Sequence, residues 1–120
     1  MWIKTHEITL TTDASGDVTV YSDELANGRV LAVIFAIGTL DTPNVTVTGE
    51  DTGTSVLTKT GLTSGTYKPH ATAQATGLGD LTYDGTYKVA VPIALANERI
   101  KVVVDSGGNA LTGTITFLIG

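Results

Sequence analysis

Two short acidic stretches carry oxygen atoms that a metal ion could use. Asp13 and Asp17 bracket the tripeptide Ala-Ser-Gly, and Glu50 and Asp51 stand in "GEDTG". Calcium takes about six to eight oxygen ligands, and the loops that bind it place acids at alternate positions. Each stretch offers only two neighbouring carboxylates. The pattern therefore favours solvated turns and predicts no bound metal and no cofactor.

The histidines do not complete a catalytic group. His70 lies in "YKPHAT", and the nearby Ser64 lies in "TSGT". A serine nucleophile needs a sharp strand-to-helix turn and a histidine oriented by a buried carboxylate, and the sequence has no G-x-S-x-G. His6 shares a strand face with Ile8 and is interpreted as a half-buried or interface residue. We predict no catalytic residue from this set.

Three further carboxylates are candidates for acid–base chemistry. Asp80, Asp84 and Glu98 could supply the pair that glycoside hydrolysis uses. All three stand among turn or flexible residues, and Trp2 is the only tryptophan, so no platform for sugar rings accompanies them. The sequence therefore predicts a protein that is not an enzyme.

The segment 61–86 differs from the rest of the chain. It is rich in glycine and threonine and weakly periodic, which predicts long surface loops around one short or irregular strand near 67–75. Loops of this length in a compact domain are usually functional or mobile. Tyrosine is enriched at interfaces. The side chains that we expect to contact a partner are Tyr67, His70, Tyr83 and Tyr87.

Composition limits the class of protein. The length of 120 residues predicts one domain, 1–120, and 42% apolar against 16% charged residues excludes ordinary disorder. The net charge of −5 argues against nucleic-acid binding. The longest apolar run, 30–37, is far too short to span a membrane, and no signal peptide is visible. The absence of cysteine excludes disulfides.

Residue types and periodicity then predict the elements that would position these side chains. Threonine, valine, isoleucine and glycine dominate, which favours strands and turns over helices. Residues 23–28 are interpreted as a connector with an Asn27-Gly28 turn. The apolar run 30–37 is expected to be a central strand, buried on both faces. Strands are expected at 5–12, 17–22, 30–37, 44–49, 55–60, 87–95, 96–106 and 111–120.

Eight or nine strands at hairpin spacing predict an all-β antiparallel sandwich, jelly-roll-like, with no substantial helix; a small barrel and an immunoglobulin-like order stay open. Pro92 lacks an N–H, so its strand is expected to lie at an edge or to carry a bulge. Glu98 and Arg99 are expected to cap the start of a strand. The apolar strand 111–120 must be paired, within its own sandwich or against a neighbouring subunit.

Three stretches resemble a family of small proteins encoded by tailed phages and prophages. They are "TTDASGDVTVYS", "RVLAVIFAIGTLD" and "VPIALANERIKVVVDSGGNALTGTITFLIG". The family pattern has a threonine-rich first hairpin, a "grvl" strand, a "tGe-ttG" turn and a terminal "aNErIkvvv-sGGna--Gt-tf-ig". The resemblance covers most of the chain and is weakest in 61–86. These motifs are structural, so no functional residue is carried over from them.

The resemblance implies a structural protein located in the virion and assembled in the host cytoplasm. Size, acidity and the all-β pattern narrow this expectation to a capsid decoration or cement protein. The expected partners are the major capsid protein and further copies of the chain, as a dimer or trimer, without nucleic acid or membrane. The alternative is a minor tail, fibre or connector component with a carbohydrate- or host-binding module.

Overall fold

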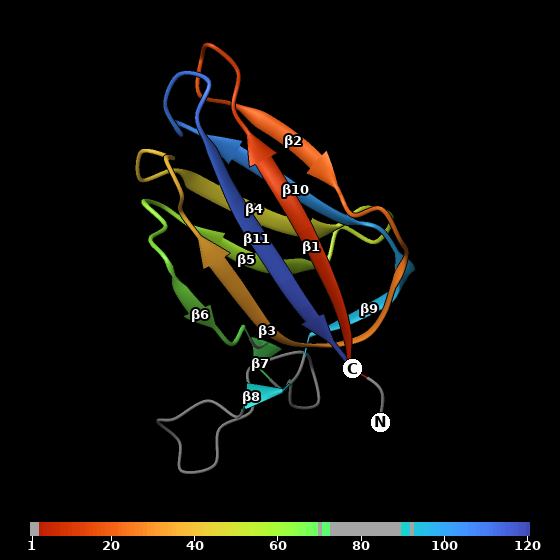
Figure 1. The fold of residues 1–120 in the computed structure, drawn as a ribbon. Helices are drawn as coiled ribbons and strands as arrows, with labels where there is room; N and C mark the ends of the chain where they lie inside the picture. Colours follow the sequence, from red (N-terminus) through yellow and green to blue (C-terminus); the bar gives the residue numbers. More distant parts are fainter. Residues whose placement is uncertain (1–2, 70, 73–89, 92) are drawn as a thin grey trace.

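The structure is a computed structural model that describes residues 3–69, 71–72, 90–91 and 93–120, and these residues form strands and no helix (Figure 1). The strands are β1 (Lys4–Thr11), β2 (Val18–Tyr21), β3 (Ala26–Ala36), β4 (Asn44–Gly49), β5 (Ser55–Lys59), β6 (Gly65–Tyr67), β7 (Ala71–Thr72), β8 (Ala90–Val91), β9 (Ala94–Glu98), β10 (Ile100–Asp105) and β11 (Thr112–Ile119).

Two antiparallel sheets pack face to face. One has the order β1-β11-β3-β6, with β9 paired to the first part of β3, and the other has the order β2-β10-β4-β5. A separate small ladder joins β7 to β8. The expected antiparallel β-sandwich is confirmed.

The pairing is that of a jelly roll. The first strand pairs with the last, β2 with β10, β3 with β6, and β4 with β5. A long antiparallel ribbon folded in half and then rolled gives these pairs, and rolling divides them between two sheets of four strands. Strands β7, β8 and β9 lie between β6 and β10 in the sequence, outside this eight-strand plan.

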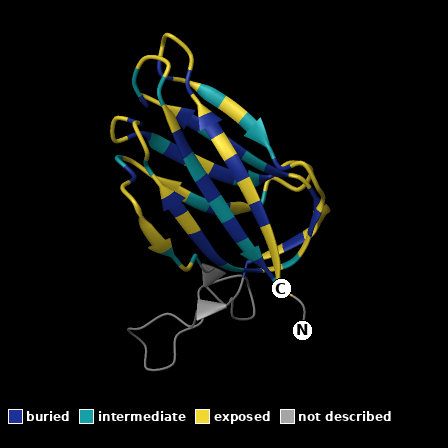
Figure 2. Ribbon diagram, viewed as in Figure 1, coloured by how far each residue is buried: buried dark blue, intermediate teal, exposed yellow. Residues whose placement is uncertain are grey.

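The alternating strands place their apolar side chains where the sequence predicted. In β11, Ile115, Phe117 and Ile119 are buried and alternate with Thr114, Thr116 and Leu118, which are only partly covered (Figure 2). β11 lies between β1 and β3, so this apolar strand is paired within its own sandwich. The two inner faces form one continuous core in which Phe35 and Phe117 are the largest buried side chains.

Strand β3 differs from its prediction in two ways. It begins at Ala26, so the second half of the expected connector, with its Asn27-Gly28 turn, lies within the strand, at an irregular step in the pairing with β9. Its outer face is also partly open, because Ile34 is 39% exposed. The run is continuous in apolar residues, yet only one face of β3 packs on the other sheet.

The predicted strand 96–106 is two strands in the structure. β9 ends at Glu98, β10 begins at Ile100, and the two belong to different sheets. Asn97 has a φ of 54°, which turns the chain at this point. Glu98, which was expected to cap the start of a strand, is the last residue of β9 and is fully buried. Pro92, which was expected at an edge or bulge, lies outside the described residues.

Three loops close one end of the sandwich by bonding to one another. The Thr12 hydroxyl donates to the carbonyl of Gly108 (2.7 Å), and the Gly107 N–H donates to the carbonyl of Gly16 (2.9 Å). The Asp41 N–H then donates to the carbonyl of Gly107 (3.0 Å). A Cβ at Gly16 would come within 2.9 Å of the Gly108 nitrogen, so this close approach requires glycine.

Candidate functional site

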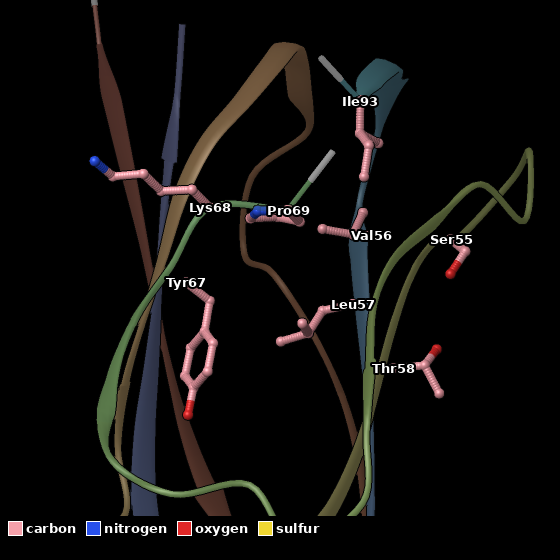
Figure 3. A pocket seen from close by; sticks show the side chains of 8 residues that line it. All are labelled: Ser55, Val56, Leu57, Thr58, Tyr67, Lys68, Pro69 and Ile93. Atoms are coloured by element: carbon pink, nitrogen blue, oxygen red, sulfur yellow. The ribbon is translucent and has the colours of Figure 1, made fainter. Parts of the chain in front are cut away.

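A groove of about 560 Å³ separates two sheet edges, β5 of one sheet and β6 of the other. Figure 3 shows Val56 and Leu57 of β5 pointing across this groove, with Ile93 above them and Tyr67 and Pro69 on the opposite side. The lining is therefore mainly apolar. It is the feature of the described residues best suited to a contact with another molecule.

Tyr67, one of the predicted contact residues, forms one wall of this groove. It is the last residue of β6, its ring is half-buried and packs against the core, and its hydroxyl donates to the carbonyl of Thr63 (2.6 Å). The sequence placed Tyr67 at the start of a short or irregular strand within a loop region, and the structure places it at the end of β6, which pairs with β3. One side of its ring supports the fold, and the other borders the groove.

The remaining predicted contact residues, His70, Tyr83 and Tyr87, lie outside the described residues, as does all of 73–86. Their role in partner contact stays a prediction. In place of the single strand expected near 67–75, the structure has two short ones, β6 and β7. Strand β6 continues the first sheet beside β3, while β7 pairs only with β8 in the described part of the chain.

The groove carries little chemistry that could make or break bonds. Among its described lining residues, the ionisable side chains are those of Tyr67 and Lys68, and Lys68 points away from the cavity in Figure 3. No carboxylate or histidine accompanies them in this lining, so no acid–base pair is assembled there. The arrangement can hold apolar side chains or stack a flat ring on Tyr67.

The two acidic stretches are turns. Asp13 accepts hydrogen bonds from the backbone N–H groups of Ser15 (2.8 Å) and Asp17 (3.0 Å), and these bonds, that from Asp17 foremost, lower the pKa of its carboxyl. In the other stretch, the Glu50 carboxylate forms a two-bond ion pair with Arg99 at 2.6 Å for each bond, which lowers the pKa of Glu50. Among described residues, no cluster of three or more potential metal ligands occurs.

Sequence reasoning named Glu98 but missed that it is a buried carboxylate with many hydrogen-bond partners. Glu98 accepts from the backbone N–H groups of Asp51 (3.0 Å), Thr52 (2.9 Å) and Ala96 (3.2 Å), and from the Thr52 hydroxyl. These bonds, with that from the Thr52 N–H foremost, lower the pKa of Glu98. The carboxylate lies directly against Gly49, where a Cβ would overlap it. Nothing local to "ANERI" signals this, because most donors come from a distant turn.

The neighbouring side chains extend this cluster to the surface. The Arg99 guanidinium lies 4.5 Å from the centre of the Tyr21 ring, and the Glu50 N–H donates to the Arg99 carbonyl (2.9 Å). Adjacent residues therefore hold the same turn from two sides, Glu98 from within and Arg99 from outside. The cluster joins β2, β4 and β10 at one end of the second sheet and has a structural role.

His6 lies on the inner face of β1 and is 7% exposed, so it is more deeply buried than the half-buried or interface position that the sequence predicted. Burial lowers the pKa of its imidazole, and Glu24 opposes that effect. Glu24 itself forms an ion pair with Lys4 (3.0 Å). Asp80 and Asp84 lie outside the described residues. No described helix is long and apolar enough to cross a membrane.

No family model and no curated protein matches the chain. Among solved structures, it is similar to a chain of "Structure of infectious bursal disease virus Gt strain", with 15% identity and a TM-score of 0.28. The match covers 98% of this chain and 32% of that one, so this chain spans about a third of its neighbour's length. A similarity with a TM-score this low supports no assignment of fold or function. The jelly-roll assignment therefore rests on the strand pairing.

Proposed function

We propose that this chain is a non-enzymatic structural protein of a virion, and specifically a capsid decoration or cement protein of a tailed phage. The observation that carries the proposal is the jelly-roll strand order, an architecture used by viral capsid domains and also by lectin domains and cupins. A shared fold supports a shared function only by analogy, because one fold can serve many functions. The resemblance of residues 11–22, 29–41 and 91–120 to small phage proteins narrows the proposal to tailed phages.

The charge and the groove support a coat role. A net charge of −5 lets a protein cover a DNA-filled shell without binding DNA that leaks from it. The groove between β5 and β6 offers an apolar lining beside two sheet edges, which suits a polypeptide segment of a partner. The proposed partner is the major capsid protein, and the proposed place of action is the assembled particle.

Copy number in purified particles tests this function. Particles are isolated from cells that carry the gene, and the chain is quantified by mass spectrometry against the major capsid protein. A decoration protein is expected at a copy number near that of the capsid protein. A few copies per particle would instead indicate a tail or connector component, and absence from particles would overturn a virion role.

A matched pair of charge reversals tests the groove. Lys68 borders it, whereas Lys59 lies at the far end of β5, and both side chains are exposed. Lys68→Glu is expected to reduce binding to undecorated capsids, while Lys59→Glu, with the same change in net charge, should bind as the parent does. Equal effects of the two changes would show that overall charge matters and that the groove does not.

Tyr67 supports a second candidate, a carbohydrate-binding module of a tail or fibre. Its half-buried ring borders an open groove, and aromatic rings stack on sugars. Binding of the isolated protein to a glycan array, lost in the Lys68→Glu variant, would favour this candidate. No glycan binding together with a high copy number in particles would exclude it.

A further inference from the structure

Among the described residues, strand β1 is the last strand of its sheet, and no strand pairs with its outer side. It forms eight paired positions with β11 and no bulge, and no other backbone bond of Lys4–Thr11 occurs among the described residues. The other edges are blunted: β2 has four residues, β6 has three, and β5 carries a bulge at Val56. Long, flat edges pair readily with another chain, and natural proteins usually shorten, bend or cover them.

The register shows which backbone groups are free. The Thr12 N–H donates to the carbonyl of Leu111 directly opposite (2.9 Å), which marks a hydrogen-bonded pair. Because such pairs alternate, the even residues of β1 direct their N–H and C=O groups toward β11. The reciprocal bonds between Gly120 and Arg29 show that the even residues of β11 direct their backbone groups toward β3. Its odd residues therefore face β1, which agrees with this alternation. The odd residues point to the free edge; they are Thr5, Glu7, Thr9 and Thr11.

Two hollows run along this edge. One of about 140 Å³ lies beside Thr5–Glu7, and the next, of about 270 Å³, lies beside Glu7–Thr9. Their opposite walls come from residues 20–24, at the end of β2 and just after it. The odd side chains of β1 are exposed. Open space therefore adjoins the backbone groups that lack a partner strand.

We propose that β1 pairs with β1 of a second copy of this chain, antiparallel, about a two-fold axis that passes between the two Ile8 residues. The first sheets of both copies then join into one continuous sheet. The interface is self-complementary, as a two-fold axis requires. The surface is distinct from the β5–β6 groove, and the inference does not depend on the proposed function.

Side-chain chemistry selects this register. Outward residues must oppose outward residues, so only every second register is allowed. With Ile8 opposite Ile8, Glu7 lies opposite Thr9 of the second copy and Thr5 opposite Thr11. The neighbouring register would place Glu7 directly opposite Glu7, and like charges in that position are destabilising. A shift in the other direction leaves a shorter paired segment.

Two further features agree with the Ile8 register. Each hydrogen-bonded pair joins odd residues, so the free N–H and C=O groups of one copy meet those of the other. The pairing also brings the Lys4 end of one β1 beside the Asp13 and Asp17 end of the other, where their charges are opposite. The chosen arrangement therefore satisfies the free backbone and avoids repulsion.

A charge swap in the purified protein tests the interface and its register. Thr9→Glu places a carboxylate opposite Glu7 of the second copy at two symmetric positions, and we expect roughly tenfold weaker dimerisation by analytical ultracentrifugation. Adding Glu7→Lys to the same chain restores opposite charges across the interface and should restore the dimer. Thr46→Glu, an equally exposed change on the outer face of the other sheet, is the matched control and should dimerise as the parent does.

Amide hydrogen exchange gives a second measurement that needs no variant. The N–H groups of Thr5, Glu7, Thr9 and Thr11 should exchange slowly at high protein concentration and fast on dilution. A parent protein that is monomeric at every soluble concentration overturns the proposal. So does a dimer whose odd amides of β1 stay unprotected, or one that Thr9→Glu and the double variant leave unchanged.

Discussion

The turn between β1 and β2 and the turn between β4 and β5 have nearly the same composition. Each combines two acids with a hydroxyl residue and a glycine at positive φ, 83° at Gly16 and 71° at Gly53. In the first turn, Asp13 bonds the backbone N–H groups of Ser15 and Asp17. In the second, the acids of the turn do not hold its backbone. A carboxylate 46 and 47 residues away, that of Glu98, does so.

This difference separates local from tertiary control of a turn. In the first turn, the carboxylate that accepts from the backbone N–H groups belongs to the turn itself, although the 106–110 loop also donates to the Gly16 and Asp13 carbonyls. The second turn needs the β9–β10 connection in place, because its Asp51 and Thr52 N–H groups otherwise have no carboxylate acceptor. Removing the acceptor should therefore do little in the first turn and much in the second.

The largest expected effect is that of Glu98→Ala. This change leaves part-buried N–H groups of the 50–54 turn and of Ala96 without their acceptor, and it empties the buried space of the Glu98 side chain; both losses are costly. We expect the thermal midpoint to fall by on the order of 10 °C, or the protein to become insoluble. Differential scanning calorimetry measures this, and an unchanged midpoint would show that the cluster contributes nothing.

Gly49→Ala should disturb the same cluster by crowding the Glu98 carboxylate and leaving its donors in place. The added Cβ overlaps the Glu98 carboxylate, so the carboxylate must leave its donors or the strand must move. Overpacking of this kind costs about 1–3 kcal/mol. Urea unfolding should show this loss. Gly53→Ala, at a glycine with open space around it, is a control in which only backbone strain at positive φ contributes.

Acid should weaken the second turn through Glu98. Its pKa in the folded protein lies below the ordinary value of 4.5, so the unfolded chain binds the proton more tightly. The stabilisation is therefore complete above about pH 4.5 and is lost as the pH falls through the folded pKa. The parent and Glu98→Gln should approach each other in stability over this acid range. A constant difference between them at every pH contradicts the assignment.

The smallest expected effect is that of the first turn. Asp13→Asn keeps a side-chain oxygen as acceptor and should leave the thermal midpoint within a degree or so of the parent, since surface substitutions usually change little. Asp13→Ala removes the acceptor but leaves the two N–H groups open to water. A fall as large as that of Glu98→Ala would show that the two turns are held alike.

The outcome at Tyr67 and in β3 shows how far the candidate site could be predicted. Tyrosine in a glycine-rich segment correctly attracted attention to this side of the molecule, and Tyr67 borders the groove. The sequence did not reveal that Tyr67 ends a strand, bonds to Thr63 and faces Val56 and Leu57. These contacts arise because β6 pairs with β3 and lies opposite β5. The expectation that β3 is buried on both faces was wrong. An apolar run shows which residues could be buried, but whether another element covers each face depends on the tertiary structure.

The sequence by itself determined the strands with strict alternation, the inward sets of β1, β4, β10 and β11, and the turn at Asp13. These features depend on the two-residue alternation of side chains along a strand and on bonds between near neighbours, and both are present in any short segment of the sequence. Only the tertiary structure decided that the first strand pairs with the last, that Glu98 is buried beneath a distant turn, and that β1 is left as a free edge. Those outcomes depend on contacts between distant segments, which form only when the whole ribbon has rolled around one core.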